Sequence, residues 1–414
     1  MLPKQKTQVV IIGAGPSGSV AGALLKKQNI DVIIIEKSIF PRFSIGESLL
    51  PACMEVIKKA KMLETVEKSN FQFKNGAAFR HRQRYAEFDF TDKFTEGAGT
   101  TFQVQRANFD KVLADEAEKK GCDIRYQHQL IDIDLTHSPL LSVLNEKQEH
   151  YQIEADFVLD ASGFARVLPR LLDLEQPSSL PSRKAIFTHV IDNIDKNVNF
   201  DRNKILVSVH PEDTEVWYWL IPFSNGTCSV GVVAKETFLT NYPSNNKQAL
   251  QQLINEEACL KTILQHAQYE TRISEISGYS ANVKSLYGEK FALLGNAGEF
   301  LDPVFSSGVT IAMKSAELAT DALIKQYAGE TVNWQREYAD PLMLGVDAFR
   351  CYVEGWYSGK FQEVVLHDNP NPKVKQMICS ILAGYAWDKQ NPFVTEPNRR
   401  LQTIFELCQL NKTE

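Results

Sequence analysis

The chain opens with a buried-strand pattern that runs directly into a glycine-rich turn. Residues 8–12 form a strand-like run that is apolar from Val9, and a helical stretch then reaches Lys27. A second run over 31–35, apolar from Val32, ends at Glu36. The turn between the first run and the helix has the sequence Gly13-Ala14-Gly15-Pro16-Ser17-Gly18. Continuous apolar runs are typical of strands that are buried on both faces of a parallel sheet. The order therefore predicts a strand–helix–strand unit with a glycine-rich first turn.

These glycines predict a dinucleotide site. Gly13 permits the tight turn, Gly15 lets a pyrophosphate approach the backbone, and Gly18 lets the helix pack against the strand. The free N–H groups at the helix N-terminus attract phosphate. Glu36 stands where a carboxylate accepts hydrogen bonds from an adenosine ribose, which fits FAD or NAD better than NADP. The pattern does not choose between FAD and NAD, and a glycine turn that binds nothing is the alternative.

The rest of the chain alternates between helix and strand patterns. Apolar spacing predicts helices over 47–70, 106–120 and 309–327, further helical sequence to about 268, and helices after 331. Strands are predicted near 122–136 and 151–160, in an antiparallel series from 184 to about 233, and at 291–295. The late return to a buried strand predicts an α/β nucleotide-binding domain in discontinuous pieces, with an inserted, mainly antiparallel sheet.

Composition excludes several classes of protein. With 45 basic and 51 acidic residues the net charge is −6, so no positive field favours nucleic acid. Hydrophobic residues make up 43%, as in ordinary globular proteins. No run approaches the roughly 18 apolar residues of a membrane span, so stable membrane insertion is not expected. Seven scattered cysteines and eight histidines without ligand spacing predict reduced thiols, a cytoplasmic protein and no metal.

Three further segments carry a family resemblance. They are Arg42-Phe43-Ser44-Ile45-Gly46-Glu47-Ser48, Asp160-Ala161-Ser162-Gly163 and Gly295-Asn296-Ala297-Gly298-Glu299-Phe300-Leu301-Asp302-Pro303. In this order they resemble segments of FAD enzymes of the aromatic hydroxylase, geranylgeranyl reductase and halogenase group. Asn296 replaces the family's acid, and an amide keeps the hydrogen bonds without the charge.

The resemblance implies a Rossmann-like FAD-binding domain with an inserted substrate domain and a C-terminal helical region. The expected FAD-binding pieces are 1–75, 106–182 and 285–330, the substrate-domain pieces are 76–105 and 183–284, and the helical region is 331–414. Together with the glycine pattern, the resemblance gives the expected FAD contacts: Gly13, Ala14, Gly15, Pro16, Ser17, Gly18, Glu36, Lys37, Arg42, Ser48, Arg106, Leu130, Asp160, Gly163, Asn296, Pro303, Gly308 and Val309.

A tryptophan-rich strand narrows the resemblance. Residues 216–222 match the Trp-x-Trp-x-Ile-Pro signature of flavin-dependent halogenases at Trp217, Trp219, Ile221 and Pro222. On a strand the first three project from one face and form an apolar wall. In the family this wall lies beside a tunnel that leads from the flavin. Ordinary packing in a sheet core is the alternative interpretation.

Lys74 is the expected catalytic lysine. Residues 71–79 resemble the segment of phenol and pyrrole halogenases in which an essential lysine precedes Gly-Ala. An ammonium can hold and polarise hypohalous acid, and a partly desolvated lysine has a tunable pKa. A solvated loop lysine is the alternative. The match ends at residues 80–82, Arg-His-Arg, where relatives usually carry Trp-Gly.

The segment Phe305-Ser306-Ser307-Gly308-Val309 resembles a stretch of the same halogenases. Small residues before a helix leave backbone N–H groups free, and Ser307 with Gly308 could hold a halide there. A plain serine cap is the alternative.

Three hypotheses follow. In the preferred one, the enzyme uses FAD reduced by an external flavin reductase, oxygen and a halide cosubstrate to halogenate an electron-rich aromatic, a phenol or pyrrole, free or bound to a carrier protein. The second is an FAD-dependent monooxygenase or a reductase of the geranylgeranyl reductase type. The third is a flavin-binding protein without turnover.

Overall fold

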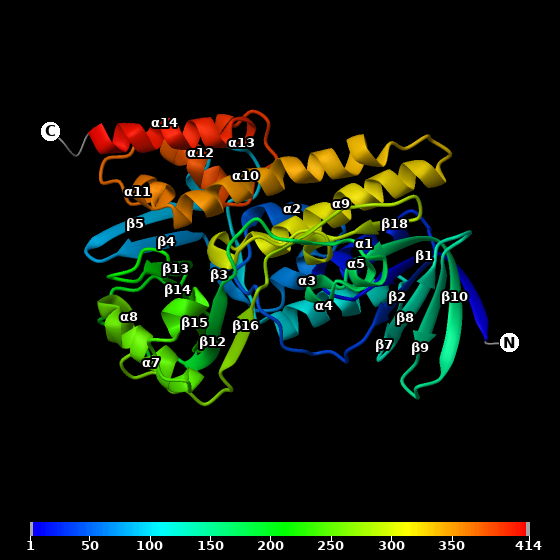
Figure 1. Ribbon diagram of the computed structural model, residues 1–414, viewed down its shortest axis with the longest axis horizontal. Coiled ribbons are helices and arrows are strands. Elements are labelled where there is room, and N and C mark those ends of the chain that lie inside the picture. The colour runs from blue at the N-terminus through cyan, green and yellow to red at the C-terminus, as the bar shows by residue number, and fades with distance from the viewer. Residues whose placement is uncertain (1–2, 411–414) are drawn as a thin grey trace.

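Two seven-stranded sheets organise the computed structural model, which describes residues 3–410 (Figure 1). The first sheet has the order β7(Asp123–Tyr126), β2(Val32–Glu36), β1(Lys4–Ile12), β10(His150–Asp160), β9(Leu140–Leu144), β8(Gln129–Asp134), with β18(Phe291–Leu293) beside the end of β10. The pairs β1–β2, β2–β7, β1–β10 and β10–β18 are parallel, whereas β8 and β9 are antiparallel neighbours. The first strand–helix–strand unit is thus present as the sequence predicts.

Helices cover the first sheet. The helix that follows the glycine turn, α1(Pro16–Lys26), packs against α4(Arg106–Lys119) and α9(Ser307–Tyr327). Other short elements connect the layers: α2(Pro51–Lys59), α3(Leu63–Glu67), α5(Val167–Leu171), and the two-stranded ribbons β3(Gln72–Lys74)–β6(Thr101–Gln103) and β11(Glu175–Pro177)–β17(Ala281–Val283).

The second sheet is mainly antiparallel. Its order is β16(Ser274–Ser277), β12(Lys184–Ile191), β15(Thr227–Ala234), β14(Trp217–Pro222), β13(Lys204–Val209), β4(Gly76–His81), β5(Arg84–Asp89). One pair, β13 with β4, is parallel. Three helices lie between β15 and β16 in the sequence: α6(Glu236–Leu239), α7(Asn246–Glu256) and α8(Ala258–Ile263). Side chains of α7 and α8 share a buried cluster with one face of the sheet. Side chains of its other face belong to the buried cluster that also contains residues of the first sheet.

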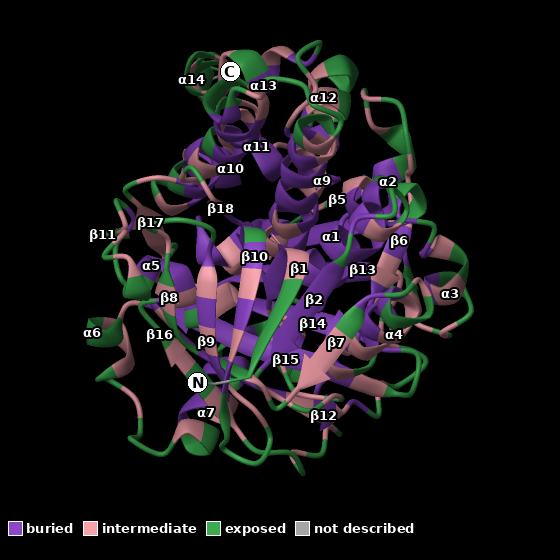
Figure 2. Cartoon of the chain, turned by 90° about the vertical axis from the view of Figure 1, so that its right-hand side faces the viewer, coloured by how far each residue is buried: buried purple, intermediate pink, exposed green. Residues whose placement is uncertain are grey.

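The C-terminal region is helical and lies along the edge of both layers (Figure 1). It consists of the π-helical turn Gln335–Ala339, α10(Asp340–Tyr357), α11(Lys360–Val365), α12(Pro372–Leu382), α13(Pro392–Thr395) and α14(Pro397–Leu410). Figure 2 shows α1, α9 and α10 largely buried, whereas α14 is exposed on its outer side. The largest buried cluster contains residues from both sheets and from these helices, which joins the layers into one core.

One predicted element is wrong in part. The sequence predicts helix over 47–70, but the backbone is extended to Leu50 and helix begins at Pro51. Ser48 forms a bridge with Gln103, and Leu49 donates its N–H to the carbonyl of Phe102. Proline at the first helical position has a backbone angle suited to starting a helix. The apolar side chains at 49, 50, 53, 54 and 57 are buried either way, so their spacing could not locate the boundary.

No helix within residues 3–410 is long and apolar enough to cross a membrane. Among the same residues, no group of three or more histidine, cysteine, aspartate or glutamate side chains is arranged to hold a metal ion. The seven cysteines are free, and six of them are buried.

Candidate functional site

A cavity of about 750 Å³ lies where the first sheet faces the second. Its wall includes the residues that follow the carboxyl ends of β1, β2 and β10, the segment 42–48, and the inner face of β14. In open parallel sheets, ligands bind outside the carboxyl ends of the strands. The cavity therefore occupies the position that the topology favours for a nucleotide.

The glycine turn forms one end of the cavity. Gly13 has φ +99°, and a Cβ there would lie 2.6 Å from the carbonyl oxygen of Ala161. A Cβ on Gly18 would lie 1.9 Å from the carbonyl oxygen of Gly13, so Gly18 lets helix and turn touch. At Gly15 a Cβ would meet Arg42 no closer than 3.5 Å. Space in front of Gly15 is therefore open to the cavity, as a pyrophosphate requires.

Glu36 is fixed beside this turn by two backbone donors. Its Oε2 accepts the Ala14 N–H at 2.9 Å, and its Oε1 accepts the Ser38 N–H at 2.8 Å. A carboxylate has further acceptor positions beyond these two. Glu36 lines the cavity and is nearly buried, so its remaining lone pairs suit the hydroxyls of a ribose.

Two arginines are held at the cavity wall by one buried carboxylate that the sequence interpretation missed. Asp110 accepts from Arg106 Nε at 2.7 Å, and its other oxygen lies 3.3 Å from Arg42 NH1. Arg106 also donates to the carbonyl of Ile45 at 2.6 Å. Both guanidinium groups line the cavity. Asp110 follows Arg106 by four residues on α4, and this spacing was the available signal.

Most of the predicted FAD contacts line this cavity. They are Gly13, Gly15, Pro16, Ser17, Glu36, Lys37, Arg42, Ser48, Arg106, Leu130, Gly163, Asn296, Pro303, Gly308 and Val309. The open cradle at Gly15, the fixed carboxylate and the two arginines fit an adenine dinucleotide with its ribose and pyrophosphate.

Three predicted contacts support the site from behind its wall. Ala14 uses its N–H on Glu36, and Gly18 packs under the turn. Asp160 is fully buried, and burial raises the pKa of its carboxyl. Its two oxygens accept the N–H groups of Ser162 and Leu168. Asp160 thus shapes the turn that presents Gly163 and does not itself line the cavity.

The start of α9 forms another part of the wall. Ser306 has φ +56° and makes no side-chain cap, so the first N–H groups of the 21-residue helix lack the serine cap that the alternative interpretation requires. Ser306, Gly308 and Val309 line the cavity, whereas the Ser307 side chain is buried behind them. An anion in the cavity would meet backbone groups here.

The tryptophan strand faces the cavity as its alternation predicts. Trp217, Trp219 and Ile221 all line it. Trp219 donates its Nε1–H to Ser229 Oγ at 3.1 Å, and its ring covers Gly231, where a Cβ would lie 2.3 Å from it. The two indoles lie 5.9 Å apart at 48°. The wall is therefore rigid and apolar.

A buried polar chain fixes the end of this wall, and sequence reasoning did not find it. Trp217 donates to Tyr357 Oη at 2.9 Å, and Tyr357 donates to Asp302 at 2.8 Å. Tyr279 lies 3.4 Å from the same carboxylate oxygen. Burial raises the pKa of Asp302 to about 6. The guanidinium of Arg183 lies 3.3 Å from the Tyr357 ring centroid.

Lys74 ends β3 and is fully buried. Its Nζ donates to Ser48 Oγ and to the carbonyl of Leu49, both at 2.7 Å, and lies 5.3 Å from the Phe90 ring centroid. Burial lowers the pKa of Lys74 to about 7. The lysine is thus not the solvated residue of the alternative interpretation. It does not line the cavity either, but Ser48 does.

A further unpredicted pair joins the segment before α2 to the second sheet. Glu47 Oε1 lies 2.7 Å from His189 Nε2 on β12. Burial lowers the pKa of His189, but the hydrogen bond and charge of Glu47 outweigh that effect and raise it. Phe43 stacks on Phe187 beside this pair, with ring centroids 6.2 Å apart. Glu47 and His189 are 142 positions apart in the sequence, so no local sequence pattern could predict the contact.

Comparison with known proteins shows the family of this chain. Residues 6–338 match the family model described as "FAD binding domain". A 1H-pyrrole-2-carbonyl-[peptidyl-carrier protein] chlorinase from Pseudomonas fluorescens is 31% identical over 340 residues, 77% of this chain and 75% of that protein.

Two solved structures are also similar. A flavoprotein/dehydrogenase from Cytophaga hutchinsonii is 41% identical, with a TM-score of 0.95 over 99% of this chain and 100% of that one. The flavin-dependent brominase Bmp2 shares the fold, with 22% identity and a TM-score of 0.84 over 99% of this chain and 100% of that one. The family match spans the cavity and both sheets, so the chain belongs to the FAD-binding-domain family and is an FAD-dependent oxidoreductase of the halogenase and monooxygenase superfamily.

Proposed function

We propose that this oxidoreductase is a halogenase of electron-rich aromatics. The observation that carries the proposal is the continuity of one cavity from the glycine turn to the Trp217–Trp219–Ile221 wall. A pyrrole-acting chlorinase at 31% identity supports the same chemistry, and a phenol or pyrrole ring, free or tethered to a carrier protein, is the proposed substrate.

Each part of the cavity would have its own task. Gly15, Glu36, Arg42 and Arg106 would bind the pyrophosphate and ribose of FAD, and the free N–H groups at Gly308 and Val309 would attract halide. Reduced FAD, from a separate flavin reductase, would supply two electrons and two protons, with which oxygen, a halide ion and one further proton become hypohalous acid and water.

The tryptophan wall and Lys74 would direct the halogen. Two indoles and Ile221 present apolar surface, which excludes water and leaves the ring of a substrate flat against them. At pH near its pKa of about 7, Lys74 is partly a neutral amine, able to take the halogen or to donate a hydrogen bond to hypohalous acid. The aromatic carbon would then gain the halogen and lose its proton. That proton and the hydroxide of the hypohalous acid together make water.

The test is a reaction with flavin reductase, NADH, FAD, bromide or chloride, and a panel of phenols and pyrroles, read by mass spectrometry. We expect halogenated product from the native enzyme and none from Lys74→Met, while NADH-driven oxygen consumption continues. Lys204→Met is the matched control, because Lys204 is also nearly buried but pairs with Asp201 away from the cavity. Product from Lys74→Met at the native rate would remove the lysine from the mechanism.

The burial of Lys74 favours one second candidate, a dehydrogenase that has no use for the lysine. The similar structure at 41% identity is that of a flavoprotein/dehydrogenase. This candidate predicts that an organic substrate bleaches oxidised FAD without oxygen or halide, in native enzyme and Lys74→Met alike. A panel of candidate substrates under anaerobic conditions distinguishes the two.

A further inference from the structure

Lys74 and the cavity are separated by the side chain of Ser48. Of the two residues that accept hydrogen bonds from Lys74, Ser48 lines the cavity and Leu49 does not. The lysine itself has no exposed surface. The Ser48 hydroxyl is therefore the contact through which we expect a molecule in the cavity to reach this amine.

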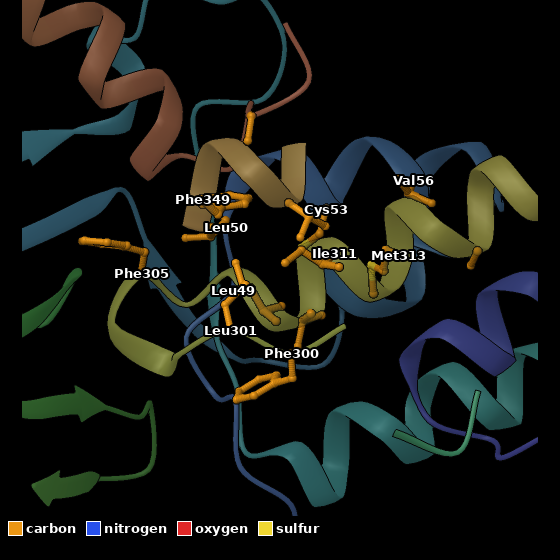
Figure 3. Close-up of a cluster of buried hydrophobic side chains, with 14 of the residues drawn as sticks. Leu49, Leu50, Cys53, Val56, Phe300, Leu301, Phe305, Ile311, Met313 and Phe349 are labelled. Carbon is orange, nitrogen blue, oxygen red and sulfur yellow. The ribbon is translucent and has the colours of Figure 1, made fainter. Parts of the chain in front are cut away.

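The backbone at Ser48 is held on both sides. The backbone carbonyl of Glu47 accepts the Val104 N–H at 2.7 Å, and the Leu49 N–H donates to the backbone carbonyl of Phe102 at 3.1 Å. Leu49, Leu50 and Cys53 then enter the buried cluster that contains Leu301, Ile311 and Phe349 (Figure 3). With the main chain fixed, rotation of the serine side chain is the available movement.

Two residues paired across the strands with Lys74 and Ser48 carry buried oxygen atoms without a hydrogen-bond partner. Thr101 is directly opposite Lys74 in the β3–β6 ribbon, and Gln103 is directly opposite Ser48. Within residues 3–410, Thr101 Oγ1 and Gln103 Oε1 are buried without a hydrogen-bond partner. A protonated lysine has three N–H donors, and Ser48 and Leu49 accept two of them. When the serine turns away, the carbonyl of Leu49 still accepts from the ammonium.

We propose that Ser48 is the positioning residue that couples Lys74 to the cavity, with its hydroxyl turning between the amine and the cavity to close and open the path. The catalytic use of this path rests on the proposed halogenase function. Whether the path exists can be tested on the protein without substrate. Because burial lowers the pKa of Lys74 to about 7, both forms of the lysine are present at neutral pH and either can be exposed by the serine.

Chemical labelling tests the path without requiring halogenation. Cyanate is small and carbamylates neutral amines, and mass spectrometry locates the modified lysine in the full-length protein, with and without FAD. We expect Ser48→Gly to raise the carbamylation rate of Lys74 at least tenfold across the pH range. Ser208→Ala, which removes a fully buried hydroxyl away from the cavity lining, should leave the rate unchanged. Equal rates in all three proteins would overturn the proposal.

Turnover tests the coupling. Ser48→Ala opens the path but also removes the hydroxyl that orients the amine. At saturating FAD it should therefore lower halogenated product at least tenfold, shift the pH dependence of product formation, and release more hypohalous acid to a soluble trap. Ser48→Thr, which keeps a hydroxyl, should restore part of the product. An unchanged product rate and pH profile in Ser48→Ala would overturn the coupling. If native enzyme makes no halogenated product, the proposed function fails, and the labelling rates still decide the role of Ser48.

Discussion

Gly15 and Gly18 differ in what a side chain would meet, and this difference separates binding from folding. Gly15 has φ −67°, which any residue adopts, and a Cβ there would make only an ordinary contact with Arg42, at 3.5 Å. Gly15→Val should therefore fold and weaken FAD binding at least a hundredfold, because its methyl groups occupy the pyrophosphate position. Gly18→Val should destabilise the protein, because its Cβ would lie 1.9 Å from Gly13 oxygen. Flavin fluorescence titration and thermal unfolding measure the two effects, and native FAD affinity in folded Gly15→Val would contradict the site.

Lys74 makes stability depend on pH in a predictable direction. Its pKa is lowered from 10.5 to about 7 by burial, so the folded protein binds fewer protons than the unfolded chain between these values. The wild type therefore loses stability as pH falls from about 10 to 7, with no further loss below. A shift of this size corresponds to about 5 kcal/mol.

Lys74→Met should remove that pH dependence. The free energy of unfolding of the variant minus that of the wild type should be about 3 kcal/mol larger at pH 7 than at pH 10, because only the wild type loses stability toward pH 7. Urea unfolding at the two pH values gives the difference directly. Since every other titrating group is common to both proteins, an equal difference at the two values would show that Lys74 has an ordinary pKa.

Among contacts between secondary-structure elements, the Glu47–His189 pair ties the segment before α2 to β12. Because the pKa of His189 is raised in the folded state, the pair stabilises the protein fully below the unfolded pKa of about 6.5, and the contribution is lost as pH rises through the folded pKa. A double-mutant cycle with Glu47→Gln and His189→Gln should give a coupling of about 1–3 kcal/mol at pH 6 and much less at pH 9. A coupling that stays constant with pH would contradict an ion pair.

The elements with strong periodicity were predictable and the contacts between them were not. Continuous apolar runs identified β1 and β2, and alternation identified β14 with its inward tryptophans. The extended stretch before Pro51 was missed, because its conformation depends on a bridge from Ser48 to Gln103, 55 residues away. Local sequence carries no information on such pairing.

The same distinction applies to the site. Cavity-lining residues belong to contiguous motifs, so most of them were found. Tyr357 and His189, in contrast, contact partners at least 55 residues away. The burial of Lys74 was also beyond sequence reasoning, since it results from the packing of two separate segments over β3.

Across the complete fold, Trp356 connects three layers. It is fully buried on α10, and its ring lies 5.8 Å from Phe79 of the second sheet and 5.8 Å from Phe305, just before α9. Trp356→Ala should lower the free energy of unfolding by about 3–5 kcal/mol. Circular dichroism and release of bound FAD should report one shared transition at the lower temperature. Leu407→Ala, on the exposed side of α14, should change little. Two separated transitions in the native protein would show that the layers unfold independently.

The order of segments along the chain also sets the time at which the cavity can form during synthesis. The glycine turn leaves the ribosome early, but the wall at Asn296, Gly308 and Val309 comes from the last third of the chain. Strand β18 adds to β10 roughly 130 residues after β10 is made. A nascent chain therefore carries an incomplete nucleotide pocket through most of translation. We therefore expect FAD to be captured late, once α9 has docked on α1, and a chain truncated before that helix to be unable to retain the cofactor.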